Sequence, residues 1–141
     1  MSTLKVTNVA HETSTLNTLV FENGGGSGNG RVTTKGTIGE ISAVSYASTI
    51  TLDFRTANNF STTLTGNVTF ANPSNISAGQ SGVLIVTQDG TGSRTAAFGS
   101  YWDFSDGTAP TLSTGANQVD VIAWIARTNT NIAAQFIGNF S

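Results

Sequence analysis

Near the end of the chain, two stretches rich in branched and aromatic residues, VDVIAWIA (residues 119–126) and IAAQFIGNF (132–140), flank the polar segment RTNTN (127–131). Two such runs with a short polar segment between them are typical of a β-hairpin. The apolar content of residues 119–126 would also suit a helix, but β-branched and aromatic side chains favour a strand. The sequence therefore predicts a hairpin at the C-terminus.

The segments before this hairpin carry strand patterns as well. Residues 50–54 and 60–64 alternate apolar and polar side chains, which is the period of a half-buried strand. The continuous apolar run 83–86 is consistent with burial on both faces. Residues 94–98 follow the turn 89–93 and are expected to return as the second arm of a hairpin. Because such segments recur about every 8–12 residues, the sequence predicts an all-β fold, an antiparallel β-sandwich or jelly roll of about eight strands.

The composition narrows the classes of function. Only 10% of the 141 residues are charged, the net charge is -2, and the chain has no cysteine and a single histidine. These counts exclude disulfides, thiolate metal sites and a pair of histidines for zinc, and they argue against a nucleic-acid surface, which needs clustered cations. No apolar run approaches the length of a membrane span. We therefore expect no cofactor, no nucleic acid and no membrane as partners.

The first thirty residues differ from the rest. A run of Gly, Ser and Asn at 23–30 has the composition of a flexible linker, so residues 1–30 are predicted to form an extended arm with its linker and residues 31–141 a β-sandwich domain. An arm with β-prone segments can add a strand to the sheet edge of another subunit. His11 is expected to be an exposed residue of this arm. The apolar arm residues that we expect to contact a partner are Leu4, Val6, Val9, Leu16, Leu19, Val20 and Phe21.

Two acidic residues, Asp103 and Asp106, are the candidates for catalysis. A pair of carboxylates facing a cleft could hydrolyse a glycoside, and with nearby carbonyls they could bind calcium. The simpler interpretation is that Asp103 lies on the polar face of a strand that buries Trp102 and Phe104, and that Asp106 belongs to an ordinary Asp-Gly turn. We favour the simpler interpretation and expect no enzyme activity.

The other singled-out residues have structural interpretations. Tyr101, Trp102 and Trp124 could form a platform for a sugar, although such large aromatic residues are more often core residues. Asp53 and Arg55 are expected to pair with each other or with a neighbouring strand, and Asp89 and Arg94 to close the turn between them.

Several short segments of the sequence, taken in order, resemble a module of tailed-bacteriophage virion proteins. The resemblance covers about residues 50–141, and the chain start STLKV is similar to the start of many phage structural proteins. The segments that carry it are NFSTTLTGNVTF (59–70), GQSG (79–82), QDGTGSRT (88–95), FGSYW (98–102), GTAPTLST (107–114) and the C-terminal hairpin.

This resemblance implies a virion structural protein without catalytic residues. The first expectation is a capsid decoration, or cement, protein: a homotrimer that binds the major capsid protein on the outer surface of the shell and stabilises it. The alternative is a tail-fibre tip that recognises a host-surface glycan through loops around Gly99–Tyr101 or Asn129–Asn131. The short N-terminal segment before the module favours the capsid surface over the tail fibre.

Overall fold

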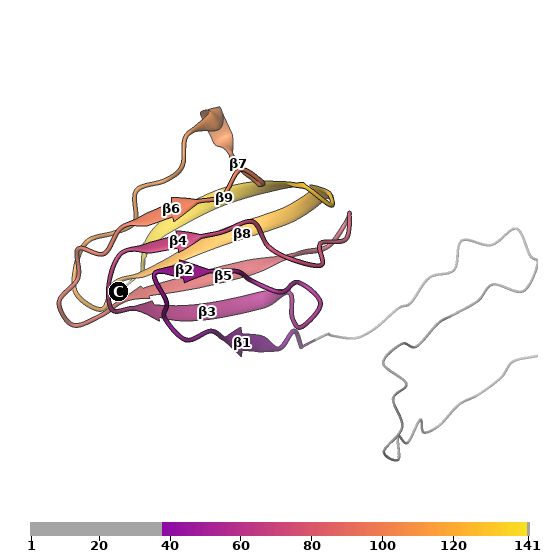
Figure 1. Cartoon of the computed structure of the whole chain (residues 1–141). Coiled ribbons are helices and arrows are strands. Elements are labelled where there is room, and N and C mark those ends of the chain that lie inside the picture. The colour runs from indigo at the N-terminus through magenta and orange to yellow at the C-terminus, as the bar shows by residue number, and fades with distance from the viewer. Residues whose placement is uncertain (1–37, 141) are drawn as a thin grey trace, which may run out of the picture. The chain divides into compact units, whose positions relative to one another are not determined.

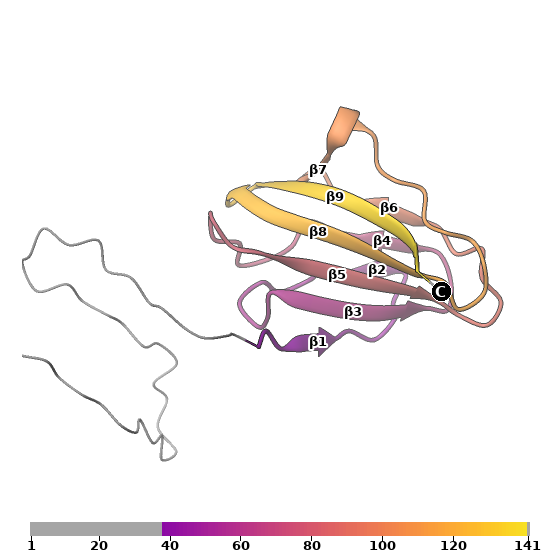
Figure 2. The ribbon, with the colours of Figure 1, turned by 180° about the vertical axis from the view of Figure 1, so that it is seen from behind.

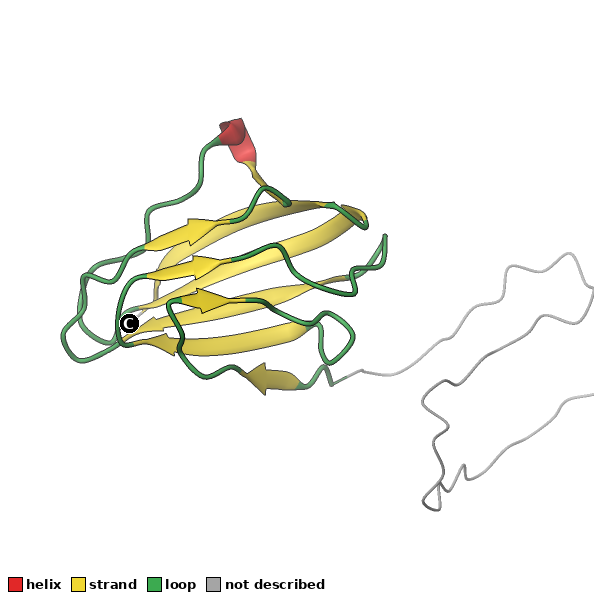
Figure 3. Cartoon of the chain, in the orientation of Figure 1, coloured by secondary structure: helices red, strands yellow, loops and turns green. Residues whose placement is uncertain are grey.

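The computed structural model describes residues 38–140, and nearly all of its regular structure is strand (Figures 1 and 3). The expected all-β class is confirmed for this part of the chain. One short 3-10 turn, η1 (Ser105–Gly107), interrupts the strands, and no helix among these residues is long and apolar enough to cross a membrane. The strands in chain order are β1 (Ile41–Ala43), β2 (Thr49–Ile50), β3 (Asn59–Leu64), β4 (Val68–Phe70), β5 (Ser81–Gln88), β6 (Ala96–Phe98), β7 (Trp102–Phe104), β8 (Val119–Thr128) and β9 (Asn131–Phe140).

The chain alternates between two sheets. A six-stranded sheet has the order β1-β3-β5-β8-β9-β7, and a three-stranded sheet has the order β2-β4-β6. Each of β1, β3 and β5 is followed in the chain by a strand of the smaller sheet, and neighbours within each series are parallel. Successive circuits of the chain therefore stack side by side, and the β8–β9 hairpin enters the larger sheet between β5 and β7 (Figures 1 and 2).

The antiparallel pairing predicted from the sequence is wrong for most of the strands. Within residues 38–140, only β5 with β8 and β8 with β9 pair antiparallel, while five other pairs of strands are parallel. The predicted hairpin around residues 89–93 does not form either, because β5 and β6 belong to different sheets. A jelly roll needs antiparallel neighbours, so that prediction is not confirmed.

The C-terminal hairpin is confirmed. β8 and β9 are joined by the two residues Asn129 and Thr130, and their register pairs Trp124 with Ala134 and Ile122 with Phe136. The loop is shorter than the predicted segment 127–131, because the polar residues at its two ends continue the strands.

The two sheets share one hydrophobic core. Strand alternation sends Phe60, Leu84 and Ile122 from the larger sheet, and Phe70 from the smaller one, into the same buried cluster. Phe54, in the β2–β3 connection, stacks on Trp124 with ring centroids 4.1 Å apart and on Phe60 at 5.8 Å. These contacts between residues distant in the sequence hold the stacked circuits of the chain together.

The apolar run 83–86 is buried on one face only, which corrects the prediction of burial on both. Leu84 and Val86 are buried, whereas Val83 and Ile85 are half-exposed on the opposite face of the larger sheet. No described element packs over that face in Figures 1 and 2.

The charge pair predicted at Asp89 and Arg94 is confirmed. The Arg94 guanidinium donates to the Asp89 carboxylate at 2.8 Å, and the backbone N–H groups of Thr91 and Gly92 donate to the same side chain. The hydrogen bond from Arg94, followed by those from the two amides, holds the pKa of Asp89 below its usual value. The turn is thus closed by an ionised carboxylate, but it leads to the other sheet rather than to a hairpin.

Candidate functional site

The described domain has two distinct ends, because β1, β3 and β5 run parallel to one another and each is followed by a strand of the smaller sheet that runs back. The chain enters at Ile38, immediately before β1, and the connections β2–β3 (residues 51–58) and β4–β5 (71–80) lie at this same end. We call it the entry end. The opposite end, which we call the far end, holds the connections β1–β2 (44–48) and β3–β4 (65–67), together with the C-terminal end of β9 (Figures 1 and 2).

The loops expected to bind a glycan lie together at the entry end. The N–H of Ile132 donates to the Tyr101 carbonyl at 2.8 Å, which places Gly99–Tyr101 beside the β8–β9 turn. Asn72 fixes this region because its side-chain oxygen accepts the N–H of Tyr101 at 2.9 Å and its amide donates to Ser100. The Asn72 side chain therefore uses its hydrogen bonds to hold the loop Gly99–Tyr101 in place.

The interpretation of Trp102 and Trp124 as an exposed platform for a sugar is wrong. Trp102 is 6% exposed and Trp124 is 4% exposed. Trp102 contacts Phe98 edge-on, and its indole N–H donates to the Ala71 carbonyl. Tyr101 is half-buried against the same core. The simpler interpretation of these residues as core is the one that the structure supports.

The two candidate catalytic acids are not combined in one site. Asp103 alternates with buried Trp102 and Phe104, as predicted, and its carboxylate accepts a hydrogen bond from Arg127 at 3.1 Å. Asp106 lies in η1 with a φ of 61°. Asp103 lines a hollow on the larger sheet to which Asp106 does not contribute. Among residues 38–140, no group of three or more acidic or histidine side chains gathers in a way that could hold a metal ion.

Asp53 and Arg55 do not pair side chain to side chain. Asn75 links them instead: its amide donates to Asp53 at 2.7 Å, and its oxygen accepts from the Arg55 guanidinium at 3.2 Å. The bond from Asn75 is the main cause of the lowered pKa of Asp53, and the backbone N–H of Arg55 adds to it. This cluster ties two entry-end loops together, and it borders a hollow of about 410 Å³.

Two predictions for the arm lie outside the described residues: the exposed position of His11, and contact with a partner through Leu4, Val6, Val9, Leu16, Leu19, Val20 and Phe21. The predicted boundary between residues 30 and 31 lies there as well.

A third hollow, near the far end, has a different chemistry. It measures about 380 Å³, within the range of about 300–1,000 Å³ that small-molecule sites occupy. We call it the hydroxyl groove, because six of its eight lining residues carry a hydroxyl and none is charged. The lining residues are Ala43, Val44, Ser45, Tyr46, Ser61, Thr62, Thr63 and Thr87.

Neighbouring residues fix the one aromatic ring of the hydroxyl groove. The Tyr46 hydroxyl donates to the Asn67 carbonyl at 3.0 Å, in the turn between β3 and β4. A side chain at Gly66 would collide with that hydroxyl, so the turn approaches the ring closely only because residue 66 is glycine. The ring is also packed against the core. The groove therefore has a rigid aromatic side.

One polar atom of the groove lining lacks a partner. The Thr62 hydroxyl is buried and has no hydrogen-bond partner among the described residues. A buried polar group without a hydrogen-bond partner lowers the free energy of unfolding by about 1–3 kcal/mol. Sequence reasoning did not single out Tyr46 or these hydroxyls, because Ser and Thr are abundant along the whole chain.

The comparisons with known proteins identify the family. Residues 49–130 match the family described as "Putative phage tail fibre C-terminal domain". The chain belongs to this tail-fibre family. The match spans more than half of the chain and includes strands β2 to β8 and part of the hydroxyl groove. No curated protein and no solved structure matches the chain.

Family membership confirms the predicted resemblance to bacteriophage virion structural proteins. It also corrects the order of the two roles that we derived from that resemblance. The capsid-surface role has no support in the match, whereas the tail-fibre alternative agrees with it. The tail-fibre domain is thus a structural protein of the virion.

Proposed function

We propose that this tail-fibre domain is a host-recognition module and that its hydroxyl groove binds an uncharged glycan on the bacterial surface. Membership of the tail-fibre family supports a role in host recognition. The groove lining supports an uncharged glycan as the ligand, since it combines hydroxyls with an aromatic ring and has no charged residue.

The chemistry of the groove matches that of a sugar. Each Ser and Thr hydroxyl can donate one hydrogen bond and accept others, which suits the hydroxyls of a saccharide. A ring such as Tyr46 offers an apolar surface to the C–H face of a sugar, together with a polar tip. The absence of charged lining residues disfavours anionic sugars, because an uncompensated anion would lose its hydration without gaining a cation.

The groove lies near the far end of the described domain, opposite the end at which Ile38 leads into β1. The residues Ser45 and Tyr46 lie in the β1–β2 connection at this far end, and Thr63 and Thr87 lie toward the ends of strands that point to it.

The experiment is a competition for adsorption. Purified full-length chain, in excess, is expected to reduce phage adsorption to host cells by at least about tenfold, and to bind untreated cells directly. Periodate oxidation of the cells, which cleaves vicinal diols of sugars, should abolish both effects, whereas protease treatment should leave them in place. A chain that never competes contradicts host recognition, and one whose binding survives periodate but not protease contradicts a glycan as the ligand.

A further inference from the structure

The hollow of about 410 Å³ at the entry end has a cation in its lining and no carboxylate. It lies between the β2–β3 and β4–β5 connections, and its volume is within the range of about 300–1,000 Å³ that small-molecule sites occupy. We call it the arginine hollow; its lining residues are Phe54, Arg55, Asn75, Ile76, Ser77 and Gln80.

Arg55 differs from the other cations in the described part of the chain. Residues 38–140 contain three arginines and no lysine. Arg94 and Arg127 form salt bridges with carboxylates at 2.8 Å and 3.1 Å, whereas Arg55 forms none within these residues. Arg55 is therefore the one arginine or lysine among residues 38–140 whose charge is not matched by a contacting carboxylate.

The nearby carboxylate of Asp53 does not contact the Arg55 guanidinium. Its Oδ1 atom accepts a hydrogen bond from the Asn75 side-chain amide at 2.7 Å and another from the backbone N–H of Arg55 at 3.0 Å. Asp53 is also not among the lining residues of the arginine hollow. An anion that enters the hollow would therefore meet the guanidinium without meeting a carboxylate in the lining.

Asn75 holds the Arg55 guanidinium in place. The Asn75 side-chain oxygen accepts a hydrogen bond from this guanidinium at 3.2 Å. Asn75 has a φ of 55°, a left-handed conformation that asparagine adopts more readily than most residues. A guanidinium has five N–H donors, and the bond to Asn75 is the one that it makes within residues 38–140. Its other donors are left for a ligand.

Gln80 fixes the two connections that form the hollow. Its side-chain amide donates to the Phe54 carbonyl and to the Asn58 side chain, the latter at 2.8 Å, and its side-chain oxygen accepts the N–H of Ser77 at 3.4 Å. These bonds set the shape of the hollow, so that a ligand has less ordering to oppose its binding.

The lining combines a planar cation with apolar and hydroxyl groups. The fork of an arginine matches a carboxylate with two parallel hydrogen bonds. Ile76 is partly buried and offers apolar surface to the C–H groups of a sugar ring, and Ser77 adds an exposed hydroxyl. From this lining we infer that the arginine hollow binds a sugar that carries a carboxylate, such as a uronic acid of a bacterial surface polysaccharide.

This second site goes beyond the proposed function. The arginine hollow and the hydroxyl groove share no residue, and they lie toward opposite ends of the described domain. They also differ in ligand chemistry, because the groove lining is uncharged and the hollow contains a cation. Either site can therefore be disabled without changing the lining of the other.

The test is the affinity of the full-length chain for sodium glucuronate, measured by isothermal titration calorimetry at low ionic strength, with glucose as the uncharged comparison. The wild type is expected to bind glucuronate at least about tenfold more tightly than glucose, because only glucuronate offers a charged acceptor to Arg55. Arg55→Gln, which removes the charge, should weaken glucuronate binding at least about tenfold.

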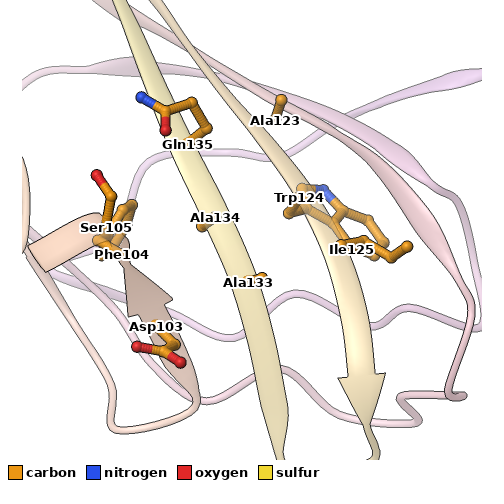
Figure 4. Close-up of a pocket in the computed structure, with 9 residues that line it drawn as sticks. All are labelled: Asp103, Phe104, Ser105, Ala123, Trp124, Ile125, Ala133, Ala134 and Gln135. Atoms are coloured by element: carbon orange, nitrogen blue, oxygen red, sulfur yellow. The ribbon is translucent and has the colours of Figure 1, made fainter. Parts of the chain in front are cut away.

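The matched control is Arg127→Gln. It removes the same charge from an arginine that is paired with Asp103, whose carboxylate lies at the hollow on the larger sheet (Figure 4). Glucuronate binding should be unchanged in this variant. Circular dichroism melting shows whether each variant is folded. Ser77→Glu, which brings a carboxylate to the arginine hollow, replaces Arg55→Gln should that variant unfold, and it is expected to weaken binding to the same extent.

Three results would overturn the inference. The first is a wild type that binds glucose as tightly as glucuronate, and the second is a folded Arg55→Gln or Ser77→Glu variant that keeps the wild-type affinity. The third is binding of inorganic phosphate as tight as that of glucuronate, because the hollow would then recognise an anion alone and not a sugar that carries a carboxylate.

Discussion

Replacing Phe54 by alanine is expected to lower the free energy of unfolding by about 3–5 kcal/mol. Phe54 is 2% exposed and its ring contacts Trp124, Phe60 and Trp102. Although it lies in a connection and not in a strand, its ring packs residues 51–58 against three strands of the larger sheet, β3, β7 and β8. Small domains are stable by only about 5–15 kcal/mol, so this single change removes a large part of the total.

Chemical denaturation followed by tryptophan fluorescence measures this loss, since Phe54 stacks directly on Trp124. Phe140→Ala is the matched control, because Phe140 is 48% exposed and its removal should change stability by no more than about 0.5 kcal/mol. Equal losses for the two variants would mean that the aromatic stack does not organise the core.

Replacing Thr63 by arginine is expected to weaken binding to host cells by at least about tenfold, which corresponds to about 1.4 kcal/mol. Thr63 is exposed on β3 and lines the hydroxyl groove. A long arginine side chain there would occupy the space of the ligand and would add a charge to an uncharged lining. The dissociation constant of labelled full-length chain on host cells is the measurement.

The control for this variant is Thr69→Arg. Thr69 is also an exposed threonine on a strand, but it belongs to the smaller sheet, away from the groove. Both variants should melt at the temperature of the wild type, and only Thr63→Arg should lose binding. If Thr69→Arg lost binding to the same extent, the loss would reflect added charge in general and the groove would not be the site.

Much of the fold could be predicted from local patterns. Alternation correctly marked Ile50, Phe60 and Leu64 as buried strand residues, and the polar segment between β8 and β9 correctly marked a hairpin. The assignment of Trp102 to the core followed from its size.

The pairing of the strands could not be predicted in the same way. A strand such as β5 has the same alternation whether its neighbours are parallel or antiparallel, because alternation reports only which face is buried. The turn after β5 contains Asp-Gly, a common hairpin residue pair, and its Asp89–Arg94 bond also formed as expected. The chain nevertheless crosses to the other sheet there, and the partly buried Phe98 of β6 stacks on Phe70 of β4 with ring centroids 5.5 Å apart.

The hydroxyl groove could not be predicted from the sequence for a related reason. Ser45 and Thr87 are far apart in the chain and resemble dozens of other Ser and Thr residues. Only the parallel stacking of β1, β3 and β5 brings the groove residues to one place. The partial exposure of Val83 and Ile85 could not be predicted either, because they belong to an apolar run that is equally compatible with full burial.

We infer that this protein is part of the tail fibre and not of the capsid surface. Immunogold electron microscopy of purified virions, with antibodies raised against the full-length chain, tests it most directly. The account predicts gold particles at the free ends of the tail fibres, in few copies per virion. Gold distributed over the capsid surface would contradict it.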